Sequence, residues 1–135
     1  MILVDSSVWI DHFRGVANAQ TEQLARWMSG RDGPPDIGLA DLVLFEVVRG
    51  FQTAATQARA RDLLLALEVV EIGGVDNALQ AASLYRRLRQ TGRTVHSPID
   101  ILLASYCITH KHTLLHRDAD FEALKTLGRL DTWPH

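Results

Sequence analysis

The sequence has a single cysteine, Cys107, so no disulfide can form within the chain. The residues around it, ILLASYCI, are apolar, and we expect the thiol to lie in the core. No cysteines and histidines show the spacing of a zinc site. These absences exclude a small disulfide-stabilised domain and a domain built around structural zinc.

The sequence also lacks a strong net charge. Its 14 basic and 16 acidic residues leave a formal charge of -2, which excludes a strongly basic protein that coats nucleic acid. No apolar run approaches the roughly 20 residues of a membrane span. The start of the chain, MILVDSSVWI, has no basic segment of the kind that opens a secretory signal. We therefore expect a cytoplasmic protein without membrane association.

The pattern that is present alternates short apolar runs with amphipathic segments. At 135 residues with 47% hydrophobic and 22% charged residues, the chain is expected to form one domain over residues 1–135. Alternating strands and helices predict an α/β fold, in which helices cover both faces of a central parallel sheet of four to five strands. We predict strands at 1–5, 36–40, 69–72 and 113–116, a short last strand at 129–133, and helices at 7–14, 18–30, 42–51, 54–67, 76–91, 98–110 and 120–127.

Several predicted helices begin at residues that favour helix starts. Ser6 and Ser7 can cap the first helix, and Asp41 can cap the third. Ser97 followed by Pro98 is a good opening for the helix at 98–110.

Acidic residues recur beside these apolar segments. Asp5 ends the first strand, Asp100 lies in the first turn of a helix, and Asp118 and Asp120 follow the fourth strand. Ligands of parallel sheets collect outside the carboxyl ends of the strands, so these acids can converge at one edge. Glu46 lies in a helix that is apolar almost all round, and it needs a partner there.

Each acid also has a local alternative. Glu46 can pair with Arg49 on the same helix, and the aspartates can serve as helix caps or first-turn acids. A single divalent-metal site accounts for all of them at once. Two carboxylates about 6 Å apart repel by roughly 3 kcal/mol at an effective dielectric constant of about 20, and a Mg²⁺ or Mn²⁺ ion removes that cost.

Four segments in this order resemble the PIN-domain family of metal-dependent ribonucleases, and most of all its VapC-type toxins from type II toxin–antitoxin pairs. They are VDSSVWID at 4–11, FEVVRG at 45–50, SPIDILLAS at 97–105 and LLHRDADF at 114–121. The resemblance implies a three-layer α/β/α PIN-like fold and Mg²⁺-dependent endonucleolytic hydrolysis of RNA, with Mn²⁺ as the alternative ion. It implies Asp5, Glu46, Asp100 and Asp118 as catalytic metal ligands, Asp120 as a further ligand and Ser6 as a supporting hydroxyl.

The chemistry expected of such a site needs no histidine nucleophile. The carboxylates would hold one or two ions, and Asp5 or Asp100 would help to remove a proton from the attacking water. We expect no direct role for the six histidines, of which His96 and His116 lie near acidic motifs. Arg117 is the best-placed of the arginines for RNA phosphates, although solvated helix faces also explain them. The candidates are Arg14, Arg49 and Arg117.

The resemblance also implies partners. Such toxins are typically homodimers that a cognate VapB-like antitoxin inhibits by laying its C-terminal segment along an apolar groove. Apolar residues of the first two helices either line that groove or, as we favour, belong to the core. They are Trp9, Phe13, Leu24, Trp27 and Met28.

Two other functions share some of these features. A receiver-type phosphoacceptor domain needs an aspartate at a mid-chain strand end and a late lysine, but VVEIGG offers no aspartate and His116-Arg117 follow the fourth strand. A non-catalytic PIN-like module would usually have lost some of the acids, and all are present here.

Overall fold

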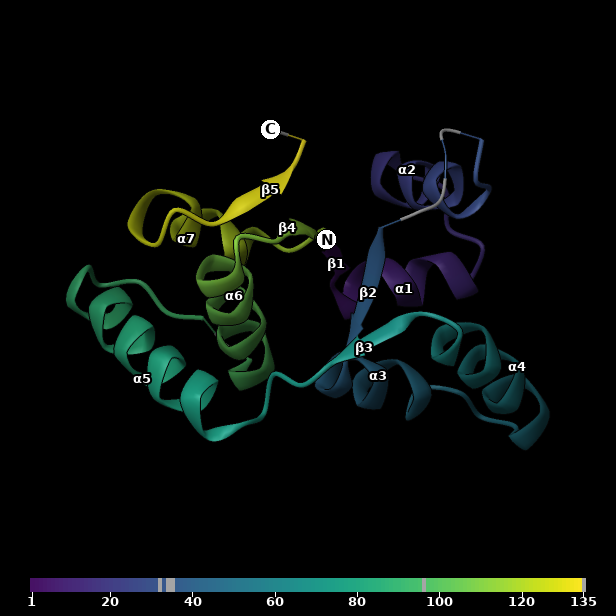
Figure 1. Ribbon diagram of the computed structural model, residues 1–135, viewed down its shortest axis with the longest axis horizontal. Coiled ribbons are helices and arrows are strands. Elements are labelled where there is room, and N and C mark those ends of the chain that lie inside the picture. The colour runs from purple at the N-terminus through teal and green to yellow at the C-terminus, as the bar shows by residue number, and fades with distance from the viewer. Residues whose placement is uncertain (32, 34–35, 96, 135) are drawn as a thin grey trace.

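The computed structural model describes residues 1–31, 33, 36–95 and 97–134. Within these residues, five parallel strands form one sheet in the order β3-β2-β1-β4-β5, as the sequence predicts (Figure 1). The strands are β1 (Ile2–Val4), β2 (Ile37–Ala40), β3 (Glu68–Val70), β4 (Thr113–Leu115) and β5 (Asp131–Trp133).

Helices connect the strands, and they gather in two groups. The first four helices lie at one side of the sheet and the last three at the other (Figure 1). This arrangement is the predicted α/β fold with helices on both sides of a parallel sheet. The helices are α1 (Ser6–Phe13), α2 (Ala19–Met28), α3 (Asp41–Val48), α4 (Ala54–Leu65), α5 (Val75–Gln90), α6 (Pro98–His110) and α7 (Glu122–Leu127), with a 3-10 turn, η1 (Ala119–Phe121), before the last.

The core lies along the central strands. Leu3 of β1 pairs with Gly38 of β2 and with Leu114 of β4, and both leucine side chains are fully buried. Strands covered on both faces carry continuous apolar residues, which is why these segments show no alternation. Cys107 is buried in the same core as predicted, and burial raises the pKa of its thiol to about 12. Within the described residues, no helix combines the length and apolar character that a membrane crossing requires.

The predicted ends of most elements differ from the structure by one to three residues, and two of these differences bear on side-chain contacts. The third strand spans Glu68–Val70 instead of 69–72, and Ile72 lies buried beyond its end. The Ile72 N–H donates to Asp41 Oδ1 at 2.9 Å. Asp41 is the first residue of α3 and not its cap, which is Ala40, and its side chain accepts this hydrogen bond instead of capping the helix.

The first and fourth strands deliver their following residues to the same place. Because β1 and β4 are parallel neighbours, both chains leave the sheet at one edge. The Asp5 N–H donates to the Leu115 carbonyl oxygen at 2.9 Å and continues the pairing one residue beyond β1. The residues after Leu115, which include two of the acids, therefore begin beside Asp5.

Candidate metal centre

Asp5 lies at the end of β1 and caps α1 with its own side chain. Its Oδ2 accepts hydrogen bonds from the Ser7 N–H at 3.2 Å and from the Ser7 hydroxyl at 2.6 Å. The capping residue is thus Asp5, not Ser6 or Ser7 as the sequence suggested. The other oxygen, Oδ1, is buried without a hydrogen-bond partner among the described residues. Burial raises the pKa of Asp5, and the hydrogen bonds from Ser7 lower it only in part.

Glu46 comes from α3 and also has an unsatisfied oxygen. Its Oε1 is buried without a hydrogen-bond partner among the described residues. Burial raises its pKa most, a side-chain hydrogen bond with Ser6 lowers it, and the charge of Asp5 raises it again. Arg49 lowers this pKa by its charge, yet its guanidinium lies over the Phe45 ring at 5.2 Å from the centroid. An ion pair with Arg49 therefore does not explain how the buried carboxylate of Glu46 is stabilised.

Asp100 lies in the first turn of α6, where it is 6% exposed. Its pKa is raised to about 8, first by burial and then by neighbouring negative charges. Those charges, in falling order of effect, belong to Asp5, Asp118, Glu46 and Asp120. Each of the other acids predicted from the sequence is therefore close enough to influence Asp100.

Asp118 and Asp120 follow β4 in a short turn. Asp118 caps η1, and its Oδ1 accepts the Asp120 N–H at 2.9 Å. One carboxylate oxygen from each of Asp100, Asp118 and Asp120 can be chosen so that the three lie within 4.8 Å of one another. Oxygens at this separation can share one cation, since a hard divalent ion holds its oxygen ligands at about 2.0–2.6 Å.

The donor set decides what this arrangement can bind. All five side chains are carboxylates, which suit Mg²⁺, Mn²⁺ or Ca²⁺ better than softer metals. Two of their oxygens are buried without partners among the described residues, at Asp5 and Glu46. A buried carboxylate oxygen without a hydrogen bond is costly, and a divalent ion would satisfy it. The residues therefore fit a divalent cation.

Two further residues at this edge were missed from the sequence. His116 is 6% exposed, and its Nδ1 accepts the Asp118 N–H at 3.1 Å. Burial lowers the pKa of its imidazole, and the Phe121 ring lies 4.8 Å away, centroid to centroid. Ser7 donates hydrogen bonds to Asp5 from its hydroxyl and its backbone N–H, and the Ser6 backbone N–H donates to the same side chain. The only sequence signal was their position: His116 directly follows an apolar strand, and Ser7 comes two residues after the acid that ends another. His96 lies outside the described residues.

The three candidate arginines have different surroundings. Arg117 Nη1 pairs with Asp11 Oδ2 at 2.9 Å, and its backbone N–H donates to the Ser7 hydroxyl oxygen at 3.4 Å. Arg14 borders a cleft of about 270 Å³ together with Phe13 and Phe51. Arg49 lies over Phe45, as described above. RNA contact by these arginines stays a prediction.

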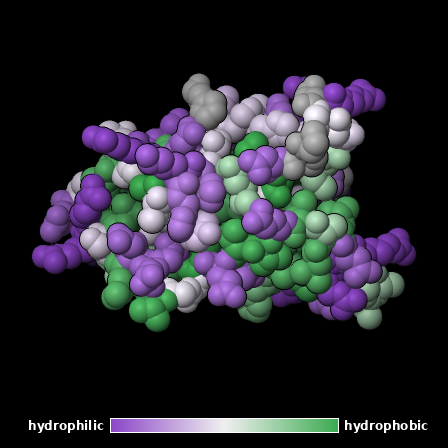
Figure 2. Space-filling view, viewed as in Figure 1, coloured by the Kyte–Doolittle hydropathy of each residue, from purple (hydrophilic) through white to green (hydrophobic). Residues whose placement is uncertain are grey.

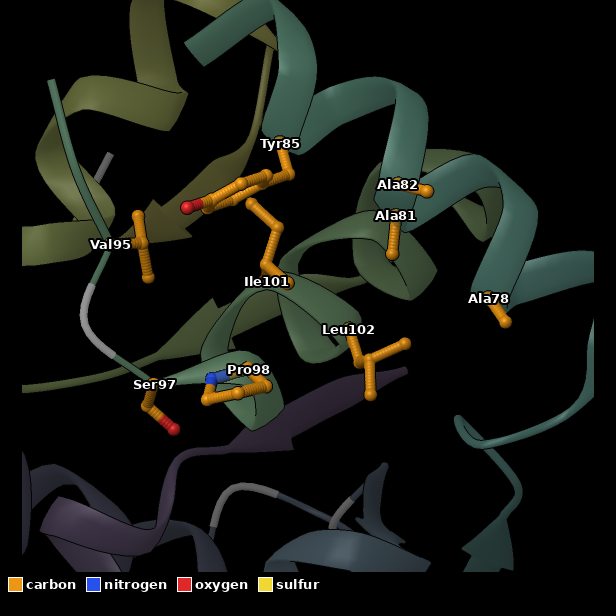
Figure 3. A pocket seen from close by; sticks show the side chains of 9 residues that line it. All are labelled: Ala78, Ala81, Ala82, Tyr85, Val95, Ser97, Pro98, Ile101 and Leu102. Carbon is orange, nitrogen blue, oxygen red and sulfur yellow. The ribbon is translucent and has the colours of Figure 1, made fainter. Parts of the chain in front are cut away.

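A separate apolar cavity of about 440 Å³ lies between α5 and α6. Tyr85 of α5 and Ile101 of α6 both line it, and Ser97 and Pro98 lie at one end (Figure 3). Its lining contains none of the five acids, although Asp100 is on the same helix. The acidic cluster is thus distinct from this cavity.

The fold and the cluster together define a class: an α/β domain with a cluster of carboxylates, of a kind that fits a divalent cation, where parallel strands end. A model of the PIN domain family matches residues 2–127, and the chain belongs to that family.

Curated relatives and solved structures agree with this placement. Over 130 residues, 96% of each chain, the sequence is 28% identical to Ribonuclease VapC11 of Mycobacterium tuberculosis and to VapC ribonuclease Mb1587 of Mycobacterium bovis. The fold is similar to VapBC2 from Rickettsia felis bound to a promoter DNA fragment, with a TM-score of 0.74, 18% identity and 98% and 97% of the two chains covered. It is also similar to Mycobacterium tuberculosis VapC20, described as a sarcin-ricin loop cleaving toxin, with a TM-score of 0.69, 19% identity and 91% and 94% covered.

Proposed function

We propose that this chain is a metal-dependent endoribonuclease that hydrolyses RNA phosphodiester bonds as the toxin of a toxin–antitoxin pair. One observation carries the proposal: oxygens of Asp100, Asp118 and Asp120 meet within 4.8 Å, close to buried oxygens of Asp5 and Glu46 that have no hydrogen-bond partner among the described residues. PIN membership and ribonuclease relatives that match 96% of the chain support the same activity.

The ion in this proposal is Mg²⁺, with Mn²⁺ as the alternative. Bound there, it would activate a water molecule and stabilise negative charge on the phosphate. The side chains that would hold it are those of Asp5, Glu46, Asp100, Asp118 and Asp120.

The protein's own side chains would hold the carboxylates and the RNA in place and accept a proton from the attacking water. Asp5 and Asp100 are the most deeply buried acids of the cluster, and a raised pKa suits either carboxylate to take a proton from the attacking water. The hydrogen bonds from Ser7 to Asp5 and between Ser6 and Glu46 would fix the two carboxylates. Arg14, Arg49 and Arg117 would contact phosphates of the RNA, and the ion pair with Asp11 would hold Arg117 in place.

The partners in this proposal are RNA, a cognate VapB-like antitoxin and a second copy of the chain, all in the cytoplasm. The solved relatives include toxin–antitoxin complexes. Trp9 and Leu24 are fully buried, so they belong to the core and cannot line a partner groove. Apolar surface is available elsewhere: hydrophobic side chains gather over β3 and α3, where Phe45 and Val69 are exposed (Figure 2).

Substitution of Asp100 tests the nuclease activity. With purified protein freed of any antitoxin, Mg²⁺ and total RNA, we expect Asp100→Asn to lower the cleavage rate at least about 100-fold, because a ligand and a proton acceptor are lost together. Asp62→Asn is the matched control, since Asp62 has a side chain that is 75% exposed on α4, and it should cleave as the wild type does.

Two results would contradict the proposal. Cleavage that survives excess EDTA would exclude a metal-dependent reaction. Wild-type protein that binds Mn²⁺ but leaves every RNA intact would indicate a non-catalytic binding module instead.

A further inference from the structure

His116 occupies an unusual position for a side chain with no assigned chemistry. It is the first residue after β4 and two residues before Asp118, and only 6% of it is exposed. Its Nδ1 accepts the backbone N–H of Asp118 at 3.1 Å, so this nitrogen carries no proton in the structure. The ring is thus hydrogen-bonded to the backbone of a residue whose carboxylate belongs to the acidic cluster.

The surroundings fix the direction of the ring. The fully buried Phe121 packs against it with ring centroids 4.8 Å apart, and the Nε2 side faces Glu122 Oε1 at 3.7 Å. Phe121 and Glu122 both belong to the segment that follows the acidic turn. The imidazole therefore contacts the turn at Asp118 and the chain directly after it at Phe121 and Glu122.

The turn itself presents two of the acids. Asp118 Oδ1 accepts the Asp120 N–H at 2.9 Å, so the backbone at 118 sets the direction of both side chains. Asp118 is half-buried, so a backbone N–H there that loses its acceptor must find another in the protein or in solvent, and the turn would shift to do so.

We propose that His116 is a positioning residue of the metal centre: by accepting the Asp118 N–H it fixes the turn that presents Asp118 and Asp120 to the ion. This inference rests on the proposed function. Residues that orient metal ligands in this way typically change metal affinity by about 10–100-fold when they are replaced.

Two substitutions separate positioning from simple packing. In His116→Asn, the side-chain Oδ1 stands near the place of Nδ1 and can accept the same N–H. In His116→Leu, apolar contact with Phe121 is kept and the acceptor is lost. If the imidazole only fills space, His116→Leu should keep more of the wild-type Mn²⁺ affinity than His116→Asn. If the imidazole positions the turn, His116→Asn should keep more of it.

The measurement is Mn²⁺ affinity of the full chain without RNA, followed by electron paramagnetic resonance of the free ion. We expect His116→Leu to weaken binding at least about 10-fold and His116→Asn to stay within about 3-fold of the wild type. Thermal unfolding should show the opposite order, with Leu at least as stable as Asn. Should the Leu variant not fold, His116→Gln takes its place, because its amide lies too far out to reach the Asp118 N–H.

Asp100→Asn separates this inference from the function it rests on. If Asp100→Asn loses Mn²⁺ while His116→Leu binds it like the wild type, the positioning role is wrong and the metal centre stands. An Asn variant that binds as weakly as the Leu variant would also overturn the positioning role. If Asp100→Asn binds Mn²⁺ as the wild type does, the metal centre is wrong and the inference falls with it.

Discussion

At the scale of single residues, a carboxylate has two oxygens, and this site uses them differently. Asp5 Oδ2 accepts the Ser7 N–H at the start of α1, while Oδ1 is buried without a hydrogen-bond partner among the described residues. Asp118 Oδ1 likewise accepts the Asp120 N–H. Helix capping and metal binding therefore do not compete as explanations of these aspartates. The cap orients the side chain, and the second oxygen remains for a cation.

Ser7 is the clearest test of that division. Ser7→Ala removes the 2.6 Å hydrogen bond to Asp5 Oδ2, which stabilises the charged carboxylate. We expect the pKa of Asp5 to rise further and the Mn²⁺ affinity to fall about 10-fold. The loss should be largest at low pH, so the curve of affinity against pH should move to higher pH, which a titration series measures.

The control for Ser7 is Ser83→Ala. Ser83 lies exposed on α5, and this change should leave the affinity curve in place. A Ser7→Ala curve that overlies the wild-type curve would show that the Ser7 hydroxyl does not support Asp5.

At the scale of helices and strands, apolar patterning predicted the existence and order of the elements well. Their ends were harder, because an end depends on one contact. Ile72 is apolar and buried, so it was assigned to the third strand, but its N–H bonds to the Asp41 side chain instead of a strand. The meeting of Asp5 with the turn after β4 followed from the rule on parallel strands. The role of His116 did not, because no sequence pattern gives the direction of a ring.

The end of α6 offers a prediction about stability. Lys111 follows the helix in the left-handed conformation, with φ 56° and ψ 43°. That conformation costs a non-glycine residue about 1–2 kcal/mol, while glycine adopts it freely. Glycine also makes the unfolded chain more flexible, and this entropy offsets part of the gain. Lys111→Gly should therefore stabilise the protein by about 0.5–1 kcal/mol, or roughly 2–4 °C in Tm by calorimetry.

Lys111→Ala is the matched control for this substitution. It removes the same charge but keeps a Cβ at the strained position, so it should not raise Tm. Equal Tm values for the Gly and Ala variants would mean that backbone conformation is not the source of the effect. Mn²⁺ affinity should be unchanged in both, since α6 carries Asp100 at its opposite end.

At the scale of the whole molecule, the acidic cluster sets the pH dependence of folding. The pKa of Asp100 is about 8 in the folded protein and near 3.8 in an unfolded chain. Between these values the folded state keeps a proton that the unfolded state has released. The free energy of unfolding therefore falls as pH rises through this range. A bound divalent ion opposes the fall, because it takes the place of the proton on the carboxylate.

A narrow pH window excludes the histidines and the thiol. The raised pKa values of Asp5 and Glu46 act in the same direction as that of Asp100, so comparison with Asp100→Asn isolates the part that Asp100 contributes. The histidines with lowered pKa values, His12, His112 and His116, cost stability only as pH falls below about 6.5, and the Cys107 thiol matters only toward pH 9. Between about pH 7 and pH 8 with EDTA, the protein should therefore lose about 1 kcal/mol of stability through Asp100. Excess Mg²⁺ should remove the loss and add about 2.7 kcal/mol at 100 times its Kd. In urea titrations, Asp100→Asn should reduce both the loss of stability with pH and the gain with Mg²⁺. An EDTA curve without slope, or the same slope in Asp100→Asn, would contradict a raised pKa at Asp100.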